Sequence, residues 1–212
     1  MSELPKIWFS RVLNHANATV PLNFSISSDK LTYGQRFRAY EPVAAEEAPE
    51  YLYFHRDKKQ ISKTREHAFR IIDGVSVVSP AVCDVLTKFD LGATQLFEVP
   101  IYNNEKKKPS KYPPHYVLHV AETKSTFVPE ASENVARVVG YYDTEPRPGA
   151  PWRGVGSTDH LAVRADCASG PAIWADPNTK YRLFFSEKLV TALVDAGIKP
   201  KALHLFEATV LP

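Results

Sequence analysis

The sequence contains few cysteines and no long apolar run. Its two cysteines, Cys83 and Cys167, lie far apart among 212 residues, which argues against a disulfide framework and favours a reducing compartment. No apolar run approaches the roughly 20 residues that a membrane-spanning helix needs. The N-terminal residues also lack the basic start and apolar centre of a signal peptide. These absences predict a cytoplasmic protein without membrane contact, in which both thiols are buried and reduced.

An excess of charge of either sign is also missing. The chain has 26 Lys and Arg residues against 24 Asp and Glu residues, a net charge of +2. Domains that bind nucleic acid are usually clearly basic, so nucleic acid is not an expected partner. The balance also gives no support for a strongly acidic inhibitor that mimics the substrate of a basic enzyme. The lysine run 106–108 has one aromatic neighbour, Tyr112, and is interpreted as a solvated connector.

Motifs for catalysis, cofactors and metals are incomplete. Ser79 and Ser186 lie at predicted strand-to-helix turns but lack the flanking glycines of a nucleophile elbow. Residues 154–157 (GVGS) complete neither a dinucleotide-binding nor a Walker motif. His115 and His119 are four residues apart on a predicted strand, which separates them by roughly 13 Å and suits surface or edge histidines better than a shared ion. We therefore predict no catalytic residue, no cofactor and no metal ligand.

One pattern that the sequence does contain closes the chain. Residues 181–211 are predicted to form a strand, a capped helix, a tight turn and a second strand. Ser186 occupies the predicted N-cap of the helix, while Gly197 and Pro200 mark its end. The helix carries one apolar stripe, which consists of Leu189, Val190, Leu193 and Val194. The pattern is typical of a helix that covers a sheet.

The same pattern occurs earlier, in residues 77–101. Ser79 is the predicted N-cap, Pro80 follows at the first helical position, and Gly92 marks the stop. The apolar stripe here consists of Val82, Val85, Leu86 and Phe89. Residues 95–98 (QLFE) then match residues 204–207 (HLFE). We interpret the two segments as related strand–helix–strand units.

Short strands are predicted through much of the remaining chain, at residues 6–12, 19–26, 36–40, 51–55, 116–122 and 161–165. Residues 68–78 predict a strand pair that turns at Asp73-Gly74, while residues 130–139 fit a strand or a short helix. Because helices are too few for regular alternation, the predicted fold class is α+β, with mixed or antiparallel sheets and the two related units.

A polar connector at residues 103–114 (NNEKKKPSKYPP) is the predicted internal boundary. It divides the chain into an N-terminal half, 1–102, which contains the first unit, and a C-terminal half, 115–212, which contains the second. We expect the two halves to pack as one globule.

Two segments are predicted to contact a partner. Trp152 and Arg153 lie in residues 143–159, a segment rich in proline and glycine that is predicted to be an exposed loop. An exposed Trp-Arg pair has the composition of a binding hot spot, with local packing of the loop as the alternative. The second segment, 41–50, is acidic, and its candidate residues are Glu46, Glu47 and Glu50. An ordinary solvated loop is the alternative there.

Five segments carry a resemblance to a known family: residues 77–79 with the helix that follows, 95–101, 116–120, 172–177 and 183–198. In their order and spacing, the sequence resembles the immunity protein 11 family of bacterial polymorphic-toxin systems, formerly a domain of unknown function. The resemblance covers roughly residues 70 to 211. Its motifs are structural, so it implies no catalytic residues.

The resemblance implies a cytoplasmic protein that binds a cognate toxin encoded nearby and blocks the toxin's active site or assembly. Two other functions remain open at this point. One is a small-ligand-binding protein or enzyme with a pocket between the two halves. The other is a structural or adaptor module of a secretion apparatus.

Overall fold

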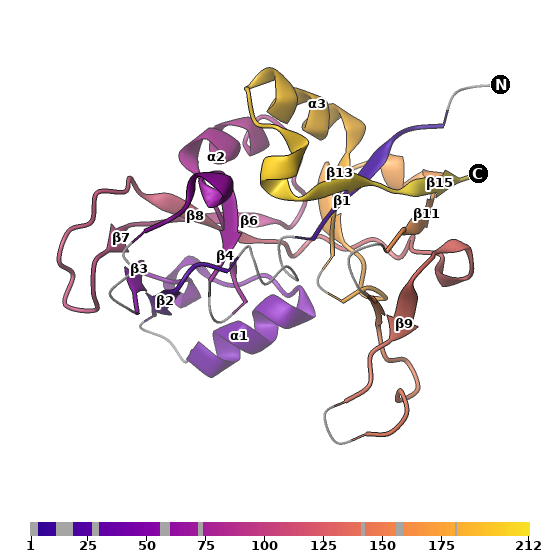
Figure 1. Cartoon of the computed structure of the whole chain (residues 1–212), viewed down its shortest axis with the longest axis horizontal. Helices are drawn as coiled ribbons and strands as arrows, with labels where there is room; N and C mark the ends of the chain where they lie inside the picture. The colour runs from indigo at the N-terminus through magenta and orange to yellow at the C-terminus, as the bar shows by residue number, and fades with distance from the viewer. Residues whose placement is uncertain are drawn as a thin grey trace.

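Three α-helices and fifteen short strands make up the described part of the chain (Figure 1). The structure is a computed structural model that describes residues 4–11, 19–26, 30–55, 60–71, 74–140, 143–155, 159–180 and 182–212, without the side chains of Lys30, Leu31 and Thr64. The strands form five sheets in which most neighbours are antiparallel. This arrangement confirms the predicted α+β class. None of the described helices is long and apolar enough to cross a membrane.

The first four-stranded sheet contains the earlier of the two units. Its strands lie in the order β4 (Ala68–Arg70), β5 (Ser76–Val78), β8 (His115–His119) and β6 (Gln95–Val99), and all neighbours are antiparallel. Helix α2 (Pro80–Leu86) connects β5 to β6. Since β8 is antiparallel to both, β5 and β6 run in the same direction with β8 inserted between them.

The second four-stranded sheet repeats this topology. Its order is β12 (Ile173–Ala175), β13 (Leu183–Ser186), β1 (Ile7–Ser10) and β14 (Leu205–Glu207), again with antiparallel neighbours. Helix α3 (Glu187–Asp195) connects β13 to β14, and β1 lies between them. The two units therefore share connectivity as well as sequence pattern.

Each sheet takes its inserted strand from the other half of the chain. Strand β8 follows the connector, yet it completes the first sheet, and β1 lies near the N-terminus, yet it completes the second. Neither predicted half, 1–102 or 115–212, contains all the strands of its own sheet. The two sheets are interlocked by this exchange.

Helices α2 and α3 pack against each other on the same side of the molecule (Figure 1). They cover one shared core, to which α2 contributes Val82 and Leu86 and α3 contributes Leu189 and Leu193. Val194, predicted for the same stripe, is 47% exposed, so the apolar face of α3 is narrower than predicted.

Neighbouring residues of the sheets face different cores, as the period of a strand requires. Val78 and Phe185 belong to the core beneath α2 and α3. Val77 belongs to a second core, which packs against α1 (Lys30–Ala39), and Phe184 belongs to a third core around Trp174. Each main sheet is therefore covered on both faces.

Three smaller sheets and five short 3-10 helices complete the described chain. The sheets are formed by β2 (Leu22–Ser25), β3 (Tyr51–Phe54) and β7 (Ile101–Tyr102); by β9 (Val135–Arg137) and β10 (Trp152–Gly154); and by β11 (Ala162–Arg164) and β15 (Thr209–Leu211). The 3-10 helices are η3 (Ala45–Glu47), η4 (Lys63–Arg65), η5 (Pro129–Ala131), η6 (Ala165–Ala168) and η7 (Pro200–Leu203).

Several local predictions need correction. The strand predicted at residues 36–40 is wrong, because residues 36–39 form the end of helix α1 and residue 40 follows it. The helix places Tyr33 and Phe37 one turn apart, where both side chains contact the ring of His119. Helix α2 ends at Leu86, well before Gly92, whose positive φ of 57° serves a later turn. The hairpin of β4 and β5 is confirmed, although Asp73 of its predicted turn lies outside the described residues.

A buried ion cluster holds the interlocked strands together. Asp159 is fully buried, and its carboxylate lies 2.8 Å from Nη2 of Arg11 and 2.8 Å from Nη2 of Arg182. Arg11 follows β1 and Arg182 precedes β13, so one carboxylate joins the two paired strands. Gly154 lies against the cluster, where any Cβ would collide with the Asp159 carboxylate.

Replacing Asp159 with Asn is expected to lower the free energy of unfolding by about 3 to 5 kcal/mol, because two buried guanidinium groups lose their counter-charge. The matched control is Asp143→Asn, which removes an ion pair to Arg147, a side chain that is 78% exposed. That change should cost about 0.5 kcal/mol or less. Urea unfolding of the three proteins measures both values, and equal losses would contradict a special role for the buried cluster.

The helix caps give a second stability prediction. The hydroxyl of Ser186 accepts a hydrogen bond from the Leu189 N–H at 3.4 Å, and Ser79 accepts from Val82 in the same way, which confirms both predicted N-caps. Ser186→Ala should destabilise the protein by about 1 kcal/mol, whereas Ser186→Gly should cost only a few tenths. Denaturant midpoints measure the difference, and an alanine variant as stable as wild type would exclude a capping role.

Candidate functional site

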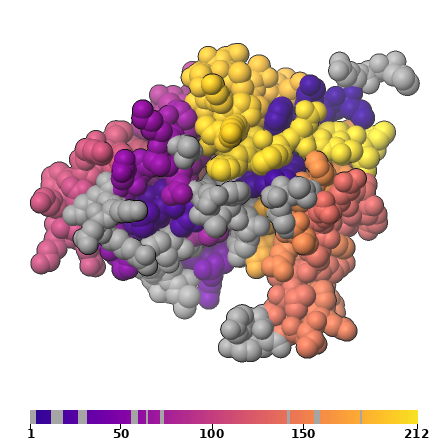
Figure 2. All heavy atoms as spheres, in the orientation of Figure 1, coloured from indigo at the N-terminus to yellow at the C-terminus, as the bar shows by residue number. Residues whose placement is uncertain are grey.

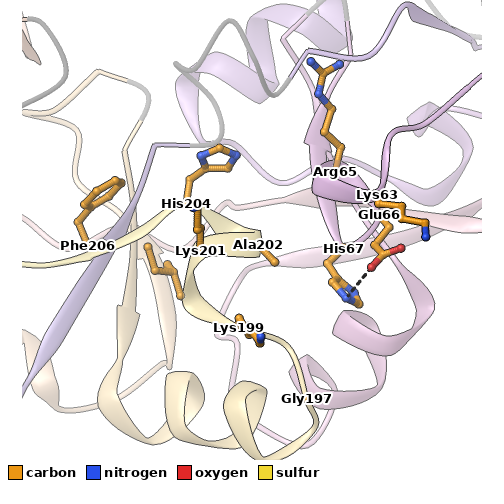
Figure 3. Close-up of a pocket in the computed structure, with 11 residues that line it drawn as sticks. Lys63, Arg65, Glu66, His67, Gly197, Lys199, Lys201, Ala202, His204 and Phe206 are labelled. Carbon is orange, nitrogen blue, oxygen red and sulfur yellow. Dashed lines mark ion pairs between the residues drawn. The ribbon is translucent and has the colours of Figure 1, made fainter.

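A groove of about 790 Å³ lies between the two interlocked units (Figure 3). One wall consists of η4 and the residues that lead into β4, and the other consists of the segment from the end of α3 through η7 to β14. The first wall carries Lys63, Arg65, Glu66 and His67. The second carries Lys199, Lys201, Ala202, His204, Leu205 and Phe206.

The rim of this groove is basic. Four cationic side chains line it, and the only lining carboxylate, Glu66, lies 3.6 Å from Nε2 of its neighbour His67. Arg65 donates a hydrogen bond to the carbonyl of Thr19 at 2.7 Å. Within the described residues, no hydrogen bond or ion pair holds the ammonium groups of the three lysines, which are Lys63, Lys199 and Lys201. A chain with a net charge of only +2 therefore concentrates positive charge here.

The floor of the groove is apolar. Leu205 is buried, Ala202 is half-buried, and Phe206 remains 40% exposed. The guanidinium carbon of Arg11 lies 3.8 Å from the centroid of the Phe206 ring and covers part of it. The groove thus combines an apolar floor with a basic rim, a combination that suits an acidic segment with apolar side chains.

Sequence reasoning did not find this groove. The two basic segments, residues 63–67 and 199–201, lie far apart in the sequence, and no sequence pattern connects them. The available signal is a pair of lysines, Lys199 and Lys201, that follows the predicted helix end at Gly197 within a few residues. Only the packing of η7 beside β4 shows that the two basic segments face each other.

The predicted Trp152-Arg153 pair lies on strand β10, so residues 143–159 are not entirely a loop. Trp152 is half-buried against the third core, and the guanidinium carbon of Arg137 lies 5.0 Å from its ring centroid. Trp152 therefore takes part in local packing, while Arg153 is exposed, and contact of this pair with a partner stays a prediction. The region around β9 projects from the body of the molecule (Figure 1, Figure 2).

Of the three candidate glutamates in the acidic segment, residues 41–50, one lies in an ion pair and two are exposed. Glu47 lies in an ion pair of 2.7 Å with Arg36 and accepts a hydrogen bond from the Ala44 N–H. Glu46 and Glu50 are exposed. The segment packs near the second core, whereas Trp152 packs on the third, so the structure does not bring the two predicted surfaces into one site.

Ser79 lies close to a histidine and a carboxylate, which invites comparison with a catalytic triad. Its Oγ is 3.4 Å from Nδ1 of His67, whose Nε2 faces Glu66. Ser79 is only 7% exposed, it does not line the groove, and its hydroxyl caps α2 through Val82. A substrate has no approach to this oxygen, so the geometry supports the capping role.

His115 and His119 were expected at the surface, and that expectation is wrong. Both are buried on β8, where Nε2 of His119 donates to the Glu41 carbonyl at 2.7 Å and Nδ1 of His115 donates to the Pro113 carbonyl at 3.0 Å. Burial lowers the pKa of both histidines, because it disfavours the charged imidazole. Among the described residues, no group of three metal-ligating side chains lies together.

Both cysteines are buried and free of disulfides, as predicted. Burial raises the pKa of the Cys167 thiol to about 11 and also raises the pKa of Cys83. Thiols with raised pKa values remain protonated near neutral pH and are poor nucleophiles.

The buried histidines make stability depend on pH. The pKa of His119 in the folded protein lies below its ordinary value of 6.5. As the pH falls through 6.5, the unfolded chain therefore binds more protons than the folded protein does. The free energy of unfolding should therefore decrease from about pH 7 to about pH 5. His119→Gln, which keeps an N–H donor, should reduce this slope, and the exposed His160→Gln should leave it unchanged. Urea unfolding across this range tests the expectation, and an unaltered slope in His119→Gln would contradict it.

Comparison with protein families gives a match over most of the chain. The model of a family described as "Immunity protein family (Imm11)" matches residues 12–206, which include α2, α3 and every residue that lines the groove. No curated protein matches the chain.

Proposed function

The chain belongs to the immunity protein family Imm11, and from this premise we propose that it binds and neutralises a cognate toxin by direct protein–protein contact. The partner is the product of a neighbouring gene in a polymorphic-toxin system that serves bacterial competition, and the complex forms in the cytoplasm. The family match over residues 12–206 carries this proposal. Neutralisation by binding requires no catalytic group on the immunity protein, so we propose that it is not an enzyme.

The interlocked sheets suit such a role. A binding protein gains affinity when its contact surface is already ordered before association, because less conformational entropy is then lost. Both main sheets are covered on both faces, and the buried Asp159 cluster ties β1 to β13. Segments that project from this scaffold are held at their bases, as binding loops on rigid frameworks are.

Two exposed surfaces remain proposed contact sites. One is the ribbon of β9 and β10, where Arg153 is exposed beside the packed ring of Trp152. The other is the acidic segment, where Glu46 and Glu50 are exposed. A stable complex should bury roughly 1,600 Å² in total.

The groove keeps one alternative function open. Its volume of about 790 Å³ lies within the range of small-ligand sites, and it lies between the two units, where this alternative expects a pocket. The burial of Ser79 argues against a catalytic version of this alternative. A ligand-binding version predicts that a small anion stabilises the free protein against heat, which the toxin-binding proposal does not require.

Co-expression with the product of the adjacent gene tests the proposal. Cells that express the toxin alone should die, cells that express both proteins should survive, and the two proteins should co-purify as a stable complex. Arg153→Glu should weaken the complex by about tenfold or more if the ribbon contacts the toxin. The matched control is Arg38→Glu, an exposed arginine on α1.

The possible outcomes distinguish a failure of toxin neutralisation from a failure of the ribbon as the contact site. Absence of both complex and survival with the wild-type chain would exclude toxin neutralisation by this protein. Survival with wild type, together with equal binding by Arg153→Glu and Arg38→Glu, would exclude only the ribbon as a contact.

A further inference from the structure

We propose that the groove between η4 and η7 is the docking site for an acidic segment of the partner protein that also carries apolar side chains. This inference rests on the proposed function and specifies the chemistry of the toxin surface that is bound. It draws on the internal repeat, the charge of the rim and the composition of the floor.

In the internal repeat, the position that corresponds to the groove is closed by a backbone hydrogen bond between the two units. Asp90 lies four residues after the end of α2, and its carbonyl accepts a hydrogen bond of 2.8 Å from the N–H of Ala172, the residue before β12. The corresponding positions in the groove are Lys199, four residues after the end of α3, and His67, the residue before β4. Within the described chain, no hydrogen bond joins Lys199 to His67, so the equivalent contact is open.

The charges of the two places also differ. Beside the bridged contact lies a smaller recess of about 390 Å³, which is lined by charges of both signs, among them Lys6, Asp90, Glu187 and Lys188. The groove instead has cations on both walls and one carboxylate. Cations that face each other across a gap repel, and among the described residues no carboxylate forms an ion pair with any of the three lysines. An anionic segment in the groove would remove this repulsion.

The floor indicates a protein segment in preference to a phosphate. Phe206 and Ala202 present apolar surface to the groove, and burying this surface is favourable only when apolar side chains cover it. Arg65, the one guanidinium of the rim, already donates to the Thr19 carbonyl and does not present a free fork to a phosphate. Lysines at the rim supply attraction for carboxylates without demanding a fixed geometry.

The test compares two double charge reversals in complex with the co-expressed toxin. Lys199→Glu with Lys201→Glu changes the groove, and Lys106→Glu with Lys108→Glu makes the same charge change on the connector, where both lysines are exposed. The groove variant should lower the association rate constant by about tenfold or more and reduce its dependence on salt. The connector variant should bind within about twofold of wild type, since its lysines lie outside the proposed contact. Lys63→Glu, on the opposite wall, should act in the same direction as the groove variant.

Thermal unfolding of each free variant confirms that the fold is intact, and Lys63→Glu decides the matter if the double groove variant does not fold. Equal binding and equal rescue by groove and connector variants would overturn the groove proposal while leaving toxin neutralisation in place. A wild-type chain that neither binds nor rescues would overturn both. Titration with the oligonucleotide dT10 is a further test. If dT10 binds in the groove of the wild-type protein, and the groove variant still binds the toxin as wild type does, the proposal is overturned.

Discussion

The exchange of strands between the two halves of the chain is the constraint on which the rest of the structure depends. β8 completes the sheet of the first unit and β1 completes that of the second. Without these strands, β5 and β6, or β13 and β14, would have no hydrogen-bonded partner between them. The exchange also explains the buried ion cluster, because it brings Arg11, Asp159 and Arg182 together from distant parts of the sequence.

The shared core under α2 and α3 follows from the same exchange. Two small units that fold alone would each bury too little apolar surface, whereas interlocked units cover one larger core. The seam between them is then the natural place for a groove. At one end of the seam a hydrogen bond from Ala172 to Asp90 bridges the units, and at the other end the basic segments leave the seam open.

Much of the fold was predictable because the relevant signals are local. Ser79 and Ser186 cap their helices, and Gly197 takes the left-handed conformation, with φ of 81°, that ends α3. The repeat, the α+β class and the family were all evident from order and spacing. Helix α1 was missed because its apolar side chains, Tyr33 and Phe37, are explained only by contact with His119, which is distant in sequence.

The sequence by itself determined the two strand–helix–strand units, their caps and the free cysteines, because capping, apolar periodicity and composition act within a few residues. Only the tertiary structure decided which strands pair, where the histidines are buried, and that two basic segments face each other across a groove. Strand pairing depends on the total packing of distant residues, and a lysine carries no sequence signal for the charges that lie opposite it. The candidate site therefore came from the fold, although every residue in it was visible from the start.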